Sequence, residues 1–78
     1  MDSEDSLLNR LTEREKEILA LIALGKNNHE IAASLKISYL TVQNHVHRLL
    51  EKLNMRNRTE ASSLYWRFHL RRSASADE

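Results

Sequence analysis

A row of polar residues within residues 38–54 has the side chains that are best suited to bind another molecule specifically. On a helix, Gln43, Asn44 and His47 fall on one face within about 100° of each other, and Arg48 flanks that face. Amide and guanidinium groups pair with adenine and guanine edges in the DNA major groove. The opposite side is an apolar stripe formed by Val42, Val46, Leu49 and Leu53. The pattern predicts a DNA-reading helix, although it is also typical of an ordinary amphipathic surface helix.

The histidines form no recognisable catalytic or metal-binding motif. His29 and Glu30 resemble the start of a zinc-protease helix, but Ala33 stands where the second histidine would be. His45 and His47 point about 200° apart on a helix, so they cannot share a metal ion. His45 borders the apolar stripe, where a packed, hydrogen-bonded histidine is favoured over a DNA contact. The sequence therefore predicts no enzyme, no metal and no cofactor.

Length and composition predict one small helical domain. The 78 residues include one glycine, no proline and no cysteine, so neither disulfides nor thiolate-bound metals can stabilise the fold. No apolar run approaches the roughly 18 residues that a membrane span needs, and no signal-peptide pattern opens the chain. We therefore expect an all-α protein in the cytoplasm, without membrane association.

The net charge of +1 conceals an asymmetry along the chain. Residues 1–40 carry five basic and seven acidic side chains, a net charge of −2, whereas residues 41–72 carry seven basic and two acidic ones, a net charge of +5. The basic half contains the amphipathic stretch. Such a distribution is typical of a phosphate-binding face, although basic residues are also locally favourable at helix C-termini.

Capping signals divide the chain into helices. A capping residue followed three positions later by glutamate occurs at 12–15, 27–30 and 57–60. Ser38 can cap a further helix, whereas Gly25 and Asn54 suit the left-handed conformation that ends one. The four predicted helices, with their capping residues, cover 12–24, 27–35, 38–54 and 57–70.

The second and third predicted helices are separated by only Lys36 and Ile37. A helix of about two turns, a tight connection and a longer amphipathic helix form the helix-turn-helix arrangement. The turn has no glycine, so the spacing carries this prediction more than the turn chemistry does. We expect residues 1–10 to be a linker or disordered, residues 11–70 to form the domain, and residues 71–78 to be a disordered tail.

Several short motifs follow one another between residue 11 and about residue 70. They are L-T-x-R-E-x-E-I-L at 11–19, Gly25, N-x-E-I-A at 28–32, L-x-I-S at 35–38, T-V-x-x-H-V at 41–46, and L-x-K-L followed by N-R-T-E-A ending at Ala61. In this order they resemble the LuxR/FixJ-type (NarL/GerE-like) helix-turn-helix domain, the output module of many bacterial response regulators and quorum-sensing regulators. The resemblance implies four helices, with the third in the major groove and the fourth mediating dimerisation.

The sequence also departs from the family pattern. Gln43 and His47 stand where the family most often has basic residues, so we expect weaker phosphate attraction and a different base preference. Because histidine titrates near neutral pH, DNA affinity should rise as the pH falls toward about 6. Asn27 and Asn57 replace serine at two helix starts, where they cap equally well. Neither a receiver nor a ligand-binding domain is present, which predicts an effector domain or a small stand-alone regulator.

Together the residues and the resemblance predict a sequence-specific transcription regulator that binds duplex DNA, with RNA polymerase as a further candidate partner and no small-molecule ligand. The side chains expected at base edges are Leu40, Gln43, Asn44 and His47, with the leucine against a thymine methyl. Those expected at phosphates are Ser38, Thr41, Arg48, Lys52, Arg56 and Arg58. Those expected at a weak homodimer interface formed on DNA are Ser62, Ser63, Trp66 and Leu70.

Trp66 leaves alternatives open. It lies about 140° from Ala61, off the apolar face of the fourth predicted helix, and the small residues beside it would allow a second copy to approach closely. The other arrangement folds Trp66 back over the first predicted helix. A second alternative belongs to a different functional class: the chain is a protein-interaction module that binds another protein through the surface around Trp66 (the Trp66 surface), and it does not bind DNA. A third, less favoured alternative is a fragment of a sigma factor's promoter-binding region. Steep weakening by salt would favour DNA over an aromatic protein interface.

Overall fold

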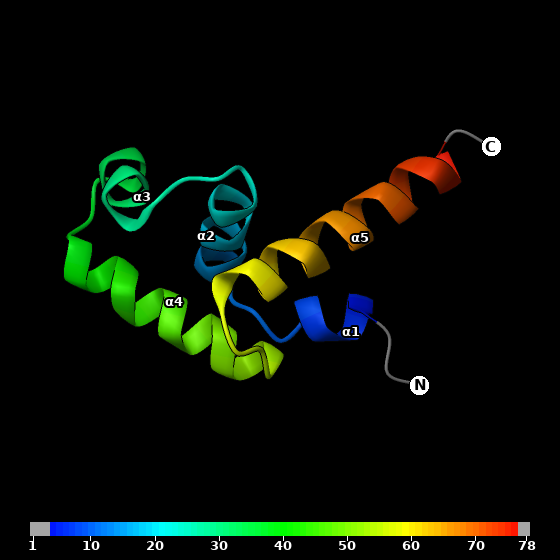
Figure 1. Cartoon of the computed structure of the whole chain (residues 1–78), viewed down its shortest axis with the longest axis horizontal. Helices are drawn as coiled ribbons and strands as arrows, with labels where there is room; N and C mark the ends of the chain where they lie inside the picture. Colours follow the sequence, from blue (N-terminus) through cyan, green and yellow to red (C-terminus); the bar gives the residue numbers. More distant parts are fainter. Residues whose placement is uncertain (1–3, 77–78) are drawn as a thin grey trace.

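The computed structural model describes the backbone of residues 4–76 and the side chains of residues 6–70. Within this range the chain forms five helices and no strand: α1 (Glu4–Leu8), α2 (Glu13–Ala23), α3 (Asn28–Leu35), α4 (Tyr39–Leu53) and α5 (Arg58–Ala76). Figure 1 shows α2 at the centre, with α3, α4 and α5 arranged around it. The predicted all-α fold class is confirmed.

Side-chain caps account for where α2 and α3 begin. Thr12 Oγ1 accepts a hydrogen bond from the Glu15 N–H at 3.1 Å, and Glu15 Oε1 accepts one from the Thr12 N–H at 2.9 Å. Asn27 and Glu30 form the same reciprocal pair, with both distances at 2.9 Å. These bonds satisfy amides that have no partner within the first helical turn. Both predicted capping boxes are confirmed.

The start of α5 differs in one contact from its predicted capping box. Asn57 Oδ1 accepts the Glu60 N–H at 2.9 Å, as expected. Glu60 Oε1, however, accepts the N–H of Arg56 at 2.8 Å instead of that of Asn57. The carboxylate thus reaches one residue further back and fixes the α4–α5 loop as well as the helix start.

Left-handed residues follow α2, α3 and α4. Gly25 (φ 87°) and Asn54 (φ 57°) adopt this conformation as predicted, since both residue types tolerate it well. Lys36, with φ 59°, ends α3 in the same way although its side chain disfavours the conformation. The next N–H, of Ile37, then donates to the Ala32 carbonyl at 3.1 Å. Lys36 therefore allows the tight helix-turn-helix connection to form without a glycine.

The hydrophobic core lies between α2, α3, α4 and α5. Its buried residues in these helices are Ile18, Leu19, Ile22, Ile31, Val42, Val46, Leu49, Leu53, Ala61 and Leu64. They follow the apolar periodicity of each predicted helix, and the four that belong to α4 form its predicted stripe. Because that stripe packs against the core, the opposite side of α4 must face solvent.

At both ends of the described chain the structure differs from the predicted linker and tail. Residues 4–8, expected to be a linker or disordered, form α1 because Leu8 packs into the core and is only 8% exposed. α5 continues to Ala76, well into the expected disordered tail, through a stretch with no glycine or proline to interrupt it. The predicted ends at residues 1–3 and 77–78 lie outside the described residues. The limits of the domain itself stay a prediction.

Candidate nucleic-acid interface

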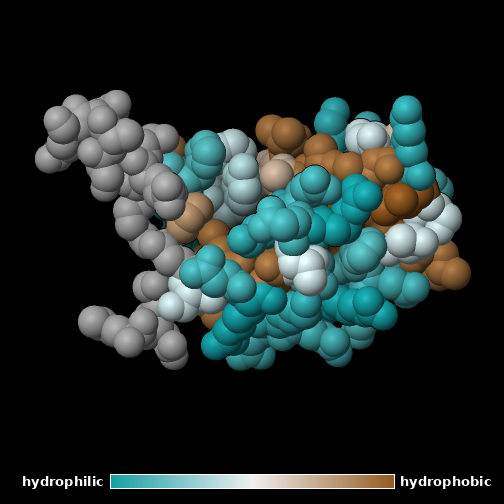
Figure 2. Space-filling view, turned by 180° about the vertical axis from the view of Figure 1, so that it is seen from behind, coloured by the Kyte–Doolittle hydropathy of each residue, from teal (hydrophilic) through white to brown (hydrophobic). Residues whose placement is uncertain are grey.

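α4 has the two faces that the sequence predicted. Its apolar stripe is buried, whereas Gln43, Asn44 and His47 are exposed. Leu40, one turn earlier, is 64% exposed. In Figure 2 hydrophilic residues cover the lower edge of the molecule, where α4 lies in Figure 1. The polar row of α4 is therefore accessible to a partner without any disturbance of the core.

Ser38 and Thr41 organise the start of α4. Ser38 Oγ accepts the Thr41 N–H at 3.0 Å, and the two hydroxyls are hydrogen-bonded at 2.8 Å. Ser38 is exposed and Thr41 is half-buried. Partial positive charge at a helix N-terminus favours anionic groups. Two predicted phosphate contacts are thus brought together at the end of α4 that also carries Leu40.

An aromatic stack joins the two helices of the helix-turn-helix. The rings of His29, in the first turn of α3, and Tyr39, the first residue of α4, have centroids 4.2 Å apart and planes 25° apart. Sequence reasoning missed this pair because the two rings meet only when the turn folds. The aromatic residue directly after the Ser38 cap was the available signal. The stack fixes the start of α4 relative to α3.

Lys52 is bonded to the body of the protein. Its Nζ donates to Glu15 Oε1 at 2.8 Å, and Glu15 is only 3% exposed. Arg10 Nη1 also donates to the Lys52 carbonyl, at 3.3 Å. The Lys52–Glu15 pair ties the last turn of α4 to the first turn of α2. This arrangement favours a role for Lys52 in holding α4 over its predicted role at a phosphate.

The environment of Glu15 keeps its carboxyl ionised. Burial by itself raises the pKa of this group. The hydrogen bond from Lys52, the contacts with Thr12 and the positive charge of Lys52 together outweigh burial, so the pKa lies below its ordinary value of 4.5. The buried carboxylate therefore carries its charge at neutral pH and remains paired with Lys52.

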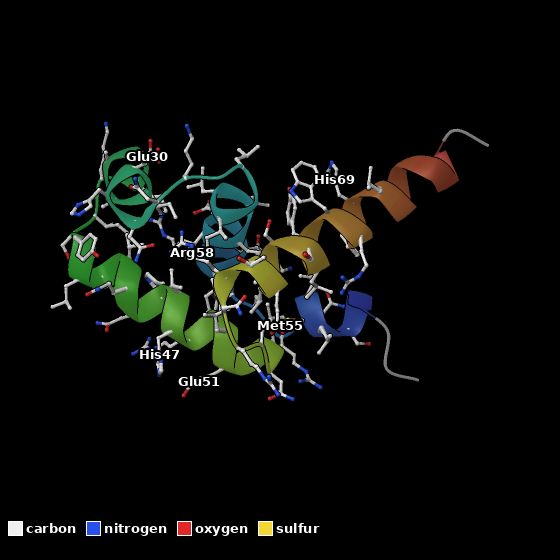
Figure 3. The ribbon with its side chains drawn as sticks, viewed as in Figure 1. Glu30, His47, Glu51, Met55, Arg58 and His69 are labelled. Atoms are coloured by element: carbon white, nitrogen blue, oxygen red, sulfur yellow. The ribbon has the colours of Figure 1, made fainter. Side chains whose placement is uncertain are left out.

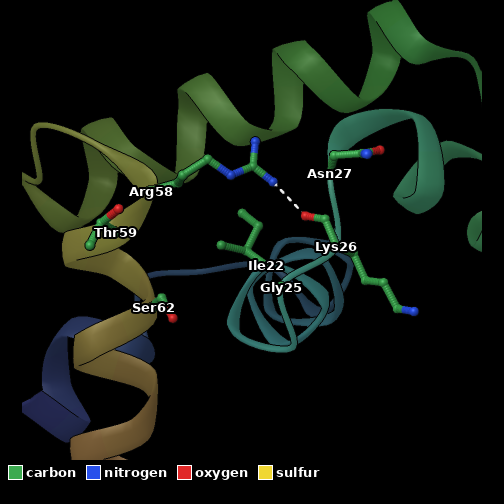
Figure 4. A pocket seen from close by; sticks show the side chains of 7 residues that line it. All are labelled: Ile22, Gly25, Lys26, Asn27, Arg58, Thr59 and Ser62. Carbon is green, nitrogen blue, oxygen red and sulfur yellow. Dashed lines mark hydrogen bonds between the residues drawn. The ribbon is translucent and has the colours of Figure 1, made fainter.

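Arg58 is also bonded within the protein. Its Nη1 donates to Asn28 Oδ1 at 2.7 Å and its Nη2 to the Lys26 carbonyl at 2.9 Å, as the dashed line in Figure 4 shows for Lys26. Figure 4 also shows that the Lys26 ammonium points away from this guanidinium, which borders an open pocket of about 400 Å³. Arg58 thus joins α5 to the start of α3. By contrast, Arg48 and Arg56 are exposed.

Trp66 lies against the C-terminal end of α2. Its Nε1–H donates to the Ala23 carbonyl at 3.0 Å, so within one chain Trp66 folds back over this helix, and its contact with a second copy stays a prediction. The indole nevertheless remains 38% exposed, and Leu70 is 64% exposed. Of the other residues predicted at a dimer interface, Ser63 is exposed and Ser62 is half-buried.

The Trp66 surface and the exposed face of α4 are separate. The Trp66 ring meets the ring of His69 edge-on, with centroids 5.9 Å apart. Figure 3 shows His69 on the opposite side of the molecule from His47 and Glu51. A partner on the Trp66 surface would therefore leave the polar row of α4 accessible.

The chain resembles known regulatory proteins over most of its length. Residues 9–65 match the family described as bacterial regulatory proteins, luxR family. Over 61 residues the chain is 51% identical to the transcriptional regulatory protein DesR of Bacillus subtilis, covering 78% of this chain and 31% of DesR. Over 61 residues it is 48% identical to the response regulator protein VraR of Staphylococcus aureus, covering 78% of this chain and 29% of VraR. It thus spans less than a third of either relative. Because the match covers most of its residues, the chain belongs to the LuxR family of bacterial regulatory proteins, whose helix-turn-helix domain binds DNA to regulate transcription.

Proposed function

We propose that the chain recognises particular sites in duplex DNA by placing α4 in the major groove. The observation that carries this proposal is the exposed polar row of α4, held above a buried stripe and directly after the helix-turn-helix connection. In such folds the first turns of the second helix approach base edges. The base-reading residues are Leu40, Gln43, Asn44 and His47.

Phosphate contacts come from a second group of residues and set the position of α4 without reading the sequence. The group comprises Ser38, Thr41, Arg48 and Arg56. The internal bonds of Lys52 and Arg58 support a different role for these two, namely holding α4 and α5 in place. Their charges still contribute to the net +5 of residues 41–72, which favours approach to DNA.

The intact protein is, in this proposal, a cytoplasmic response regulator of which the chain is the effector domain. Support comes from the relatives, which are a transcriptional regulatory protein and a response regulator, and from their length, of which the chain covers less than a third. Among the described residues, none of the helices combines the length and the apolar character of a membrane span. The chain has a binding role and no catalytic one, and RNA polymerase is a further partner at the promoter.

Two copies of the chain would meet through α5 when they occupy neighbouring half-sites. Trp66 is the central side chain of this contact, because its bond to Ala23 fixes the indole while leaving part of the ring exposed. Ser62, Ser63 and Leu70 surround it. A contact formed mainly by one helix falls below the roughly 1,200 Å² of a standard interface. We therefore propose a monomer in solution that dimerises on DNA.

Selection of preferred sites from random duplexes tests the proposed function. Asn44→Ala or Gln43→Ala should lower affinity for the selected site by about 1–3 kcal/mol and relax the preference at one base pair. Arg48→Ala should weaken selected and random duplexes alike and flatten the dependence on salt. If all three variants lost the same affinity for selected and for random duplexes, α4 would not lie in the major groove. The alternative is a protein-interaction module that uses the surface around Trp66, and membership of the family does not support it. It would gain support if the chain bound duplex DNA with no dependence on salt, since a specific DNA contact must weaken as salt is added.

A further inference from the structure

Glu51 is an acidic residue on the face of α4 that is proposed to approach DNA, where a negative charge is unfavourable. Gln43, His47 and Glu51 follow one another at intervals of four residues, so they form one row along α4. The Glu51 side chain is 66% exposed. DNA phosphates repel a carboxylate in this position. The side chain therefore favours binding only if it also makes a specific contact that offsets the repulsion.

Among the described residues, the Glu51 carboxylate forms no hydrogen bond or ion pair with another helix. Residues 41–72 contain two acidic side chains, and the other one, Glu60, binds the Arg56 N–H and so fixes the α4–α5 loop. The described contact of the Glu51 carboxylate is with His47, one turn earlier on the same exposed face. Figure 3 shows both side chains extending away from the body of the molecule.

The contact with His47 orients the carboxylate. His47 Nε2 lies 3.3 Å from Glu51 Oε2, which places one oxygen against the imidazole. A carboxylate accepts hydrogen bonds through both oxygens, so the second can serve a partner. Holding a long, exposed side chain in one orientation before binding also reduces the entropy that is lost on contact. Arg56 borders the same surface hollow as His47 and Glu51, and its positive charge reduces repulsion by phosphates.

We propose that Glu51 is a base-reading residue that accepts a hydrogen bond from the N4 amine of cytosine, and that His47 positions it. In the major groove cytosine presents an amine donor, whereas adenine presents its amine beside the N7 acceptor, which repels a carboxylate. Guanine and thymine present acceptors only at this edge, so they offer Glu51 no donor. This inference rests on the proposed function, since it requires α4 to lie in the major groove.

The test compares site selection from random duplexes by the wild-type chain, Glu51→Gln and Glu51→Ala. The wild type should prefer cytosine at one position. Glu51→Gln should shift that position toward adenine, because glutamine pairs with adenine N6 and N7. Glu51→Ala should reduce the preference for cytosine at that position about tenfold. It should still bind random duplexes at least as well as the wild type, because a negative charge has been removed.

A matched control separates base reading from a simple change of charge. Glu17→Gln removes the same charge from an exposed pair on α2, where Glu17 lies 3.1 Å from Arg14, and it should leave the preference unchanged. The positioning role is tested by His47→Ala, which should weaken the cytosine preference, and by His47→Gln, whose amide can donate a hydrogen bond to Glu51 and should restore the preference.

The outcomes distinguish this inference from the function on which it rests. If both Glu51 variants select the wild-type sites, Glu51 does not read a base, although site-specific binding by the chain would stand. If Glu51→Ala gains affinity equally for selected and random duplexes, the carboxylate only repels phosphates. If the wild-type chain shows no preference among duplexes, the proposed function fails and this inference fails with it.

Discussion

Lys52→Met should destabilise the fold by an amount that depends on pH. The substitution keeps an apolar stem but removes the ammonium that lies 2.8 Å from Glu15 Oε1. Removing one partner of a buried ion pair costs about 3–5 kcal/mol, whereas an exposed pair contributes about 0–1 kcal/mol. Glu15 is buried, but the Lys52 side chain is 37% exposed and therefore partly screened by water. We expect an intermediate loss of about 2 kcal/mol in the free energy of unfolding at neutral pH.

The pH dependence follows from the lowered pKa of Glu15. A carboxyl with a lower pKa in the folded state contributes stability above its unfolded-state pKa, and that contribution is lost as the pH falls through the folded-state pKa. In Lys52→Met, burial acts on Glu15 against fewer favourable contacts, so the pKa rises. The wild type should therefore lose its advantage over Lys52→Met as the pH falls below the ordinary value of 4.5.

Urea denaturation followed by far-UV circular dichroism measures this effect across the acidic to neutral range. Lys16→Met is the matched control, because the Lys16–Glu13 pair is exposed and longer, at 3.5 Å, and its loss should change stability by less than about 0.5 kcal/mol. In a Glu15→Gln background, Lys52→Met should cost little, since the charge that it balances is gone. A loss that is the same at every pH, or the same in the Glu15→Gln background, would refute the reasoning.

Two further substitutions test hydrogen bonds that join α5 to the rest of the fold. Arg58→Ala should lower the free energy of unfolding by about 1–3 kcal/mol and leave the salt slope of DNA binding unchanged; a slope smaller by about 1 would identify a phosphate contact instead. Trp66→Phe keeps an aromatic ring but removes the indole donor, so urea denaturation should show a loss of about 1 kcal/mol, and an unchanged midpoint would contradict the role of that bond.

Local signals predicted most of the fold because their causes are local. The capping residues Thr12, Asn27 and Ser38 satisfy amides within the same turn, so sequence alone specifies three of the helix starts. Gly25 and Asn54 similarly determine the ends of α2 and α4. The apolar period of α4 identified its buried side and therefore its exposed side. The candidate base-reading residues could be chosen on that basis.

Contacts between distant residues could not be predicted in this way. A helical wheel gives the face on which Lys52 lies, but its partner Glu15 belongs to another helix, 37 positions away in the sequence. Arg58 likewise has its partners 30 and 32 positions away. α1 was missed for a related reason, because a stretch this short has no helical period and Leu8 forms part of the core only once the other helices are in place.

The most direct test of the central claim is a titration of the chain with a duplex that holds one half-site and is too short for two copies. Backbone amide chemical shifts, measured by NMR, report which surface meets the DNA. We predict that the largest changes fall on residues 40–47 and on Glu51, that they weaken steeply with added salt, and that the Trp66 indole signal hardly moves. Changes concentrated around Trp66 and His69, with α4 unaffected, would contradict the claim that α4 reads DNA.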